Sequence, residues 1–267
     1  YDTFGFPADL TADIARERGL DTDEAGFEVL MDEQRTRART AGRFEASLEQ
    51  TLQIEGSVEF LGYESLESQS KVVDLFKLEA DSVEEVDELA AGEQGIVLLD
   101  RSPFYAQAGG QVGDVGEFRS DDLVFAVSDT TKGAGQHLHH GRVEKGVLRK
   151  ADVVSAAVVG DRRRDIARNH SATHLLHAAL KSVLGDHVEQ KGSLVDATHL
   201  RFDFSHHEAV SDEELARIEE MVNLRVLENS LVSTELMSFK AAVASGAMAL
   251  FDEKSVSYTH LRAHETP

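Results

Sequence analysis

Two histidines four residues apart, His170 and His174, have the spacing in this sequence that most directly suggests chemistry. Residues four apart on a helix project from one face, with Cβ atoms roughly 5–6 Å apart. Two neutral imidazoles so placed can bind one zinc ion, but zinc takes four ligands, or three and a water, so the pair makes half a site. Ser171 stands where a metalloprotease helix has its catalytic glutamate. From spacing alone a structural pair is the more common case, and His177, one turn on, fits a core position as well as a site.

A glycine-dense segment, residues 104–114, is the second candidate. Glycine permits positive φ and the close approach of a ligand or another backbone. The segment has neither the Gly-Lys-Ser/Thr ending of a P-loop nor the GxGxxG spacing of a dinucleotide site. On pattern alone it is best interpreted as a hairpin turn of a β-barrel.

Three weaker candidates remain. Residues 190–193, Gln-Lys-Gly-Ser, follow the histidine pair and could bind an ester or a phosphate, although a solvated connector is the plainer interpretation. The second of these candidates is the group of three histidines His137, His139 and His140. Alternation along a strand would divide them between two faces, which disfavours a metal site there. The pair His206-His207 lies in a polar loop and is interpreted in the same way.

Composition narrows the classes of protein. The 267 residues contain no cysteine, which excludes disulfides and thiolate chemistry, and the net charge is −22. No apolar run approaches the roughly 18 residues of a membrane helix, and no signal peptide opens the sequence, so we expect a cytoplasmic protein without a membrane partner. The acidic balance argues against non-specific nucleic-acid binding and against DNA as a partner. Residues 131–168 nevertheless carry nine basic and four acidic side chains.

Periodicity predicts an α+β protein: a helical N-terminal segment, a small β-barrel, then an α/β core. A helix should run from Pro7 to Arg18 with Gly19 as its stop, and a capping box at Asp21 and Glu24 should open a second helix. Short β-branched runs between glycine-rich turns then predict strands of a barrel. These runs are Lys71–Leu78, Ile96–Leu99, Leu123–Val127 and Val153–Val159.

The second half alternates helix and strand. Asp161 should cap a long helix that ends at Leu184, before Gly185. A capping box at Ser211 and Glu214 should open another helix with one apolar stripe. The stripe comprises Leu215, Ile218, Val222 and Val226, and the expected strands are Leu200–Phe204 and Leu231–Met237.

Several of these segments, taken in order, resemble the alanine–tRNA ligases. Residues 1–7 resemble the end of that family's helical tRNA-recognition region, and residues 104–114 resemble the glycine-rich loop of its editing domain. Residues 169–175 resemble its first zinc half-motif. Residues 190–193, 200–204 and 246–251 follow in the family's order, so the resemblance covers about residues 1–254.

The sequence departs from the family pattern in three places. Gln107 stands where the family usually has glutamate. The second zinc half-motif, Cys-x-x-x-His, would lie beyond Phe251 and is absent from this sequence. Residues 255–267 do not resemble the family and are interpreted as a foreign tail, for which disorder is the expectation. We therefore do not combine the tail's His260 and His264 with the helical pair into a four-histidine zinc site.

The resemblance implies boundaries and roles. Residues 1–45 would end the tRNA-recognition region, residues 50–160 form the barrel with the glycine-rich loop, and residues 161–254 form an incomplete editing core. That core would hydrolyse mischarged Ser- and Gly-tRNA. Such correction is needed because the pocket that selects alanine for attachment to tRNA rejects an added hydroxyl poorly. The implied metal ligands are His170 and His174, the implied catalytic residues Thr173 and Gln190, and the implied substrate-binding residues Gly109, Gly110, Gln111, Lys191, Gly192 and Arg201.

The implied cofactors and partners follow. Zinc would occupy the half site, and ATP and magnesium would bind a catalytic core located before Tyr1. The partner would be alanine tRNA, whose acceptor-stem phosphates the basic segment 131–168 could follow. We expect the chain alone to be inactive. The alternatives are a free-standing aminoacyl-tRNA deacylase, a threonine–tRNA ligase editing domain, or a non-catalytic tRNA-binding fragment.

Overall fold

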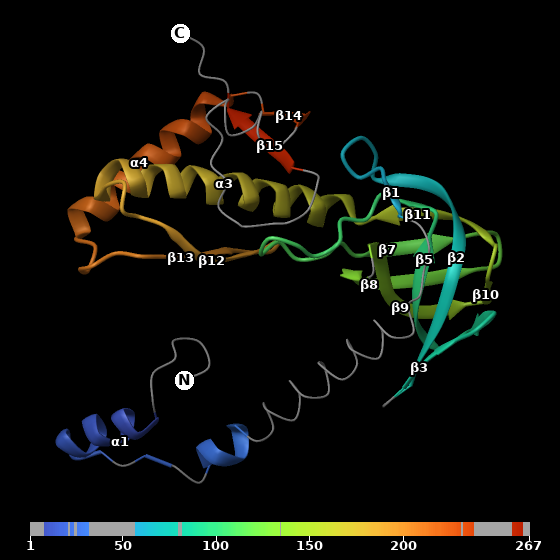
Figure 1. The fold of residues 1–267 in the computed structure, drawn as a ribbon, viewed down its shortest axis with the longest axis horizontal. Coiled ribbons are helices and arrows are strands. Elements are labelled where there is room, and N and C mark those ends of the chain that lie inside the picture. The colour runs from blue at the N-terminus through green and yellow to red at the C-terminus, as the bar shows by residue number, and fades with distance from the viewer. Residues whose placement is uncertain are drawn as a thin grey trace.

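The computed structural model describes residues 8–20, 22–23, 26–31, 57–79, 82–133, 135–230, 232–237 and 258–263. Within these residues a β-barrel is followed by two helices and a hairpin (Figure 1). The predicted α+β class is confirmed. Among the described residues, none of the helices combines the length and the hydropathy that a membrane-spanning helix requires.

Six antiparallel strands close into the barrel. Going round it, the order is β11-β7-β8-β9-β5-β2, and β2 pairs with β11 to complete the ring. The strands are β2 (Glu67–Glu79), β5 (Gln94–Leu99), β7 (Gly116–Arg119), β8 (Val124–Gly133), β9 (Gln136–Lys145) and β11 (Val153–Val158). Shorter strands flank them: β1 (Glu59–Phe60), β3 (Ser82–Glu85), β4 (Glu88–Ala90), β6 (Arg101–Ser102) and β10 (Val147–Arg149). Full closure removes unpaired sheet edges.

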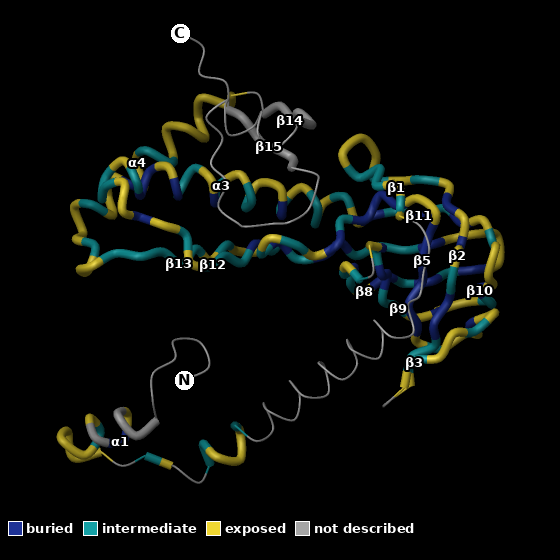
Figure 2. Tube along the Cα trace, in the orientation of Figure 1, coloured by how far each residue is buried: buried dark blue, intermediate teal, exposed yellow. Residues whose placement is uncertain are grey.

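The barrel interior is the main core of the described residues (Figure 2). Alternate residues of each strand point inward, which is the period-two pattern that the sequence showed. Three phenylalanines, Phe104, Phe118 and Phe125, are fully buried, and the rings of Phe118 and Phe125 stack with centroids 5.5 Å apart. Such aromatic pairs add roughly 0.5–1.5 kcal/mol beyond the burial of their area.

Helix α3 (Gly160–Leu184) leaves the barrel directly after β11. The prediction that Asp161 caps this helix is wrong: the N-cap is Val159, which has no side-chain cap, and Asp161 lies in the first turn, where it forms an ion pair with Arg164. A carboxylate in the first turn still favours the helix dipole. The predicted stop is confirmed at Gly185, whose φ is 114°.

A hairpin and a second helix pack along α3. The hairpin consists of β12 (Gln190–Val195) and β13 (Leu200–Phe204), and α4 (Asp212–Glu228) follows it. Leu180, Val188 and Ile218 are buried between these elements and form a separate small core. The segment at 190–193 is therefore a paired strand and not a solvated connector.

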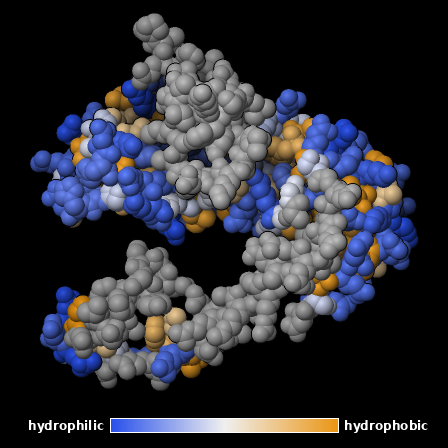
Figure 3. All heavy atoms as spheres, viewed as in Figure 1, coloured by the Kyte–Doolittle hydropathy of each residue, from blue (hydrophilic) through white to orange (hydrophobic). Residues whose placement is uncertain are grey.

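The predicted start of α4 is confirmed, because Ser211 and Glu214 form a complete capping box. Its apolar stripe is less buried than predicted: Ile218 is buried, whereas Leu215 and Val226 are 50% and 57% exposed. On the side of the molecule that Figure 3 shows, the described residues are mainly hydrophilic, with scattered hydrophobic residues.

The remaining described elements lie near the ends of the chain. Helix α1 (Ala8–Glu17) is followed by Gly19 at φ 70°, as predicted, and residues 26–31 are helical. Strand β14 (Val232–Met237) pairs with β15 (Tyr258–Ala263), which lies within the segment interpreted as a foreign tail. Four predicted features lie outside the described residues: residues 1–7, the Asp21–Glu24 box, residues 246–251 and His264.

Candidate functional site

The histidine pair lies in the N-terminal half of α3, and the face of this helix that points inward carries Ile166, Thr173, His177 and Leu180. Spacings of seven, four and three residues place these four side chains on one stripe. His170 is half-buried beside this stripe and His174 is exposed. The pair therefore lies at the border between the buried stripe and solvent.

The two imidazoles of the pair lie face to face. Their ring centroids are 5.1 Å apart and their planes are 22° apart. Although His174 is exposed, partial removal of its ring from water lowers its pKa. Partial burial, and then the proximity of His174, lowers the pKa of His170. Both rings therefore favour the neutral form, which is the form that binds metals.

A residue of the glycine-rich loop contacts the first histidine. The Oε1 of Gln111 lies 2.5 Å from the Nδ1 of His170, and the Gln111 side chain is buried. With the amide oxygen as acceptor, Nδ1 donates the proton, so the lone pair of Nε2 is left for another partner. Residues that ligate metals through one ring nitrogen commonly donate the other N–H in this way.

The same loop also binds the hairpin. The Val195 N–H donates to the Gly110 carbonyl at 2.8 Å, and the Val112 N–H donates to the Val195 carbonyl at 3.1 Å. Gly110 has a φ of 86°, and a Cβ there would lie 2.5 Å from the carbonyl oxygen of Ser193. Gly110 is thus required for packing against β12. Gly109, at φ 59°, has open space where a Cβ would lie.

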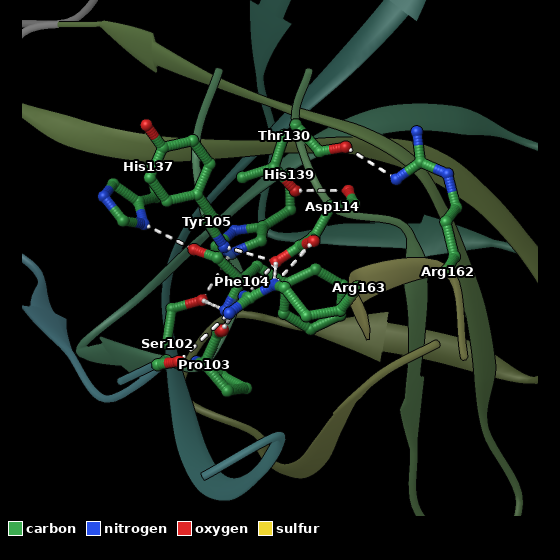
Figure 4. Close-up of polar contacts among 12 residues, drawn as sticks. Ser102, Pro103, Phe104, Tyr105, Asp114, Thr130, His137, His139, Arg162 and Arg163 are labelled. Carbon is green, nitrogen blue, oxygen red and sulfur yellow. Dashed lines mark hydrogen bonds and ion pairs between the residues drawn. The ribbon is translucent and has the colours of Figure 1, made fainter. Parts of the chain in front are cut away.

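A buried ion pair fixes the base of the loop to α3 (Figure 4). The Arg163 Nε donates to both oxygens of Asp114, which also accepts from the Tyr105 N–H at 2.7 Å. The guanidinium of Arg163 further donates to the carbonyls of Gly62 and Pro103, and Arg162 donates to that of Gly113. These positioning residues were not predicted from the sequence, although it shows an arginine run, residues 162–164, at the start of the predicted helix.

Thr173 is buried between the two histidines in sequence. Its Oγ1 donates to the Asn169 carbonyl at 2.8 Å, and the Asn169 amide donates to the Asp196 carbonyl in the β12–β13 turn. The hydroxyl proton of Thr173 is therefore engaged, and its oxygen retains lone pairs that can accept a hydrogen bond.

The predicted residues of the hairpin divide into two groups. Gln190 donates from Nε2 to the Ser193 hydroxyl at 3.1 Å, and that hydroxyl donates in turn to the Gly109 carbonyl at 3.4 Å. Gln190 is thus linked to the glycine-rich loop. Two other predicted residues, Lys191 and Arg201, are exposed and pair with Glu189 and Asp203, and a Cβ at Gly192 would lie 2.7 Å from Asp203 Oδ2.

One nitrogen of the inward stripe lacks a partner among the described residues. The Nε2 of His177 is buried and makes no hydrogen bond, and its ring lies against Phe202 with centroids 5.1 Å apart. Burial is the main cause that lowers the pKa of His177, so the ring is neutral. One turn beyond His174, this face of the helix therefore carries a buried ring nitrogen whose hydrogen-bonding capacity is unused among the described residues.

The histidines of β9 have internal partners. His139 is fully buried, with Nδ1 2.8 Å from the Val97 carbonyl and Nε2 2.8 Å from the Ser102 hydroxyl. Burial lowers its pKa to about 3. The Nδ1 of His137 lies 2.9 Å from the Phe104 carbonyl, and the Nε2 of His140 lies 2.8 Å from the Thr131 hydroxyl. These contacts agree with the structural interpretation of the group.

Several bases of the segment 131–168 are engaged within the protein. Arg149, Lys150, Arg163, Arg164 and Arg168 all pair with carboxylates. Arg142 and Arg162 donate to backbone carbonyls. The segment therefore offers phosphates less positive charge than its composition indicated.

Two comparisons place this chain among known proteins. The family model for class II (A) tRNA synthetases matches residues 1–162. An alanine–tRNA ligase of Pseudomonas entomophila (strain L48) is 52% identical over 254 residues, which is 95% of this chain and 29% of that protein. The chain thus spans about 29% of the length of this relative. The family match ends in the first turn of α3, so only the second comparison extends over the histidine pair and the hairpin.

Proposed function

Because the chain belongs to the class II (A) tRNA synthetases and is a homologue of the alanine–tRNA ligases, we propose that it is the editing part of such a ligase. In this proposal, α3 and the β12–β13 hairpin form the site that hydrolyses the ester of Ser-tRNA or Gly-tRNA. The whole protein would join alanine to its tRNA with ATP and magnesium, through residues outside this chain.

The observation that carries the proposal is the convergence of three separate segments. Gln111 of the glycine-rich loop contacts His170, and Gly110 of the same loop binds Val195 of the hairpin. Residues from positions 110, 170 and 195 thus meet at one place. A turn that only closed a barrel would have no need of a buried amide directed at a histidine.

The residues present fit half of a zinc site. His170 and His174 would hold the ion, because both rings are neutral and the Gln111 contact leaves Nε2 of His170 available. Zinc requires further ligands, which the resemblance assigns to a Cys-x-x-x-His segment. A zinc ion held there would supply Lewis-acid polarisation and a fixed point for orienting the substrate.

The protein's own residues would select the substrate. Serine differs from alanine by one hydroxyl, and a site built to hydrogen-bond that group disfavours a substrate that lacks it. A free lone pair of Thr173 Oγ1 would accept a hydrogen bond from this hydroxyl, because the threonine's own proton is donated to the Asn169 carbonyl. Gln190, linked through Ser193 to the loop, would contact the aminoacyl end of the tRNA.

Replacement of Thr173 by valine tests this selection, since valine retains the shape and removes the hydroxyl. In the protein extended by its Cys-x-x-x-His segment, we expect deacylation of Ser-tRNA to fall about tenfold, the value of one good hydrogen bond, with Gly-tRNA little affected. Thr173→Ser should retain the preference for Ser-tRNA. Equal loss on both substrates would contradict the role of Thr173 in selection.

A further inference from the structure

Three histidines meet at the opposite end of the hairpin from the glycine-rich loop. His187 lies in the connection between α3 and β12, and His206 and His207 follow β13. One ring nitrogen from each lies within 4.8 Å of the other two. His187 Nε2 is 2.9 Å from His206 Nδ1, and the three ring centroids are 4.8–5.1 Å apart. The sequence showed only the His206-His207 pair.

The backbone around this group is well fixed. The Ser205 N–H donates to the Glu189 carbonyl at 3.0 Å, and the Ser205 hydroxyl accepts from the Glu189 N–H at 3.2 Å. The same hydroxyl lies 3.3 Å from the His187 carbonyl, and Val188 between them is fully buried. The two segments that carry the histidines are thus held together before any ligand binds, which reduces the ordering cost of binding.

We propose that His187, His206 and His207 form a binding site for a divalent transition-metal cation. Imidazole nitrogen suits zinc, copper and nickel, and three protein ligands with one open position form a common coordination set. Glu208 lies close by, with its Oε1 3.6 Å from His207 Nε2, and adds negative charge beside the cluster. Nitrogens bound tetrahedrally to zinc at about 2.0–2.1 Å lie roughly 3.4 Å apart, which small rotations of exposed side chains can reach.

This site is separate from the half site on α3. Leu184 ends α3 ten residues after His174, so at about 1.5 Å per residue the helix alone separates them by roughly 15 Å. His187 precedes Gln190, the first residue of β12, by three residues, and His206 follows the last residue of β13 by two. A cation at the cluster would therefore link the two strands at their open end. We therefore expect it to stabilise the open end of the hairpin without entering the proposed editing site.

Titration with zinc chloride tests the proposal in variants that separate the sites. All variants carry H260Q and H264Q, which remove the imidazoles of the tail. H170Q/H174Q should bind one zinc ion, shift the Cε1–H resonances of His187, His206 and His207, and raise the thermal midpoint. The His207 side chain is 69% exposed, so H207A should fold. This substitution should lower the affinity at the cluster about tenfold or more. H199Q, at another exposed histidine, should leave the affinity unchanged.

Two results would overturn the cation site. One is loss of all zinc binding in H170Q/H174Q, which would assign the metal to α3 alone. The other is an affinity that falls equally in H207A and H199Q, which would indicate unspecific binding by surface histidines. Neither readout uses deacylation, so failure of this proposal is distinguishable from failure of the editing function.

Discussion

The side-chain oxygen of Gln111 accepts a hydrogen bond from Nδ1 of His170 at 2.5 Å, which joins the glycine-rich loop to the helix of the histidine pair. This contact fixes the tautomer and the orientation of the ring. The resemblance assigns Gln111 to substrate binding, and we propose that it also positions the proposed metal ligand His170.

Loss of this contact should weaken zinc binding. In the protein extended by its Cys-x-x-x-His segment, Gln111→Ala should lower zinc affinity about 10- to 100-fold, as removal of such partners does elsewhere. Gln111→Glu keeps an acceptor oxygen and should retain most of the affinity. Competition with a chromogenic chelator measures both, and Gln107→Ala in the same loop is the matched control. Unchanged affinity in Gln111→Ala would remove the positioning role.

The ion pair between Asp114 and Arg163 should be a large contributor to stability. The Asp114 side chain is 1% exposed and that of Arg163 is 15% exposed. Asp114→Asn leaves a largely buried guanidinium without its counter-charge, so we expect a loss of about 3 kcal/mol in urea unfolding. Asp161→Asn breaks the exposed pair with Arg164 and should cost less than about 1 kcal/mol. Equal effects of the two variants would contradict this assignment.

The two adjacent glycines of the loop should differ in their tolerance of a side chain. Both have positive φ, so alanine should cost about 1–2 kcal/mol at either position through backbone strain. At Gly110 the new Cβ also meets the Ser193 carbonyl, so the hairpin must move. Hydrogen exchange of the Val195 amide, which donates to Gly110, should therefore accelerate in Gly110→Ala far more than in Gly109→Ala. The same rate in both variants would show that the close approach has no effect.

Buried histidines of β9 should make stability depend on pH. Burial lowers the pKa of His139 to about 3 and of His137 to about 4, while the unfolded chain titrates near 6.5. Below pH 6.5 the unfolded state binds protons that the folded state does not, so stability falls as pH falls, by about 1.4 kcal/mol per pH unit for each group. Urea unfolding should show this slope between pH 6 and 5, and little of it above pH 7.

A variant isolates the contribution of one of these groups. His139→Gln removes the titrating ring from the barrel, so its unfolding free energy should change less steeply with pH by about one proton between pH 6 and 5. His199→Gln, at an exposed position, provides the comparison. A slope in His139→Gln as steep as that of the parent protein would contradict the burial of a neutral ring.

Much of the fold was predictable because its signals are local. Alternating β-branched runs predicted strands at β2, β5, β8 and β11, and the Ser211–Glu214 box predicted the start of α4. The start of α3 was predicted two residues late, because Asp161 has the right residue type for a cap but lies in the first turn, whereas the N-cap is Val159. Short strands such as β4 and β10 carry too few residues to show a period.

The candidate site was predictable in its members but not in its contacts. The spacing of His170 and His174 indicated a shared helix face, and glycines marked a loop. Tertiary pairing then determined that Gln111 reaches His170, that Gly110 packs on Ser193, and that His187 joins the pair at 206–207. Those relationships join residues 19 to 83 positions apart, and no local pattern encodes them.

We propose that the pair on α3 belongs to a hydrolytic editing site, and a joint measurement of Ser-tRNA hydrolysis and zinc content decides whether it does. Two proteins are compared: this chain, and this chain with its tail replaced by the Cys-x-x-x-His segment of the family. We predict that only the second holds stoichiometric zinc at α3 and releases serine, and that His174→Gln abolishes both properties. If the completed protein neither binds zinc through His174 nor cleaves the ester, the histidine pair is structural and the editing function is wrong.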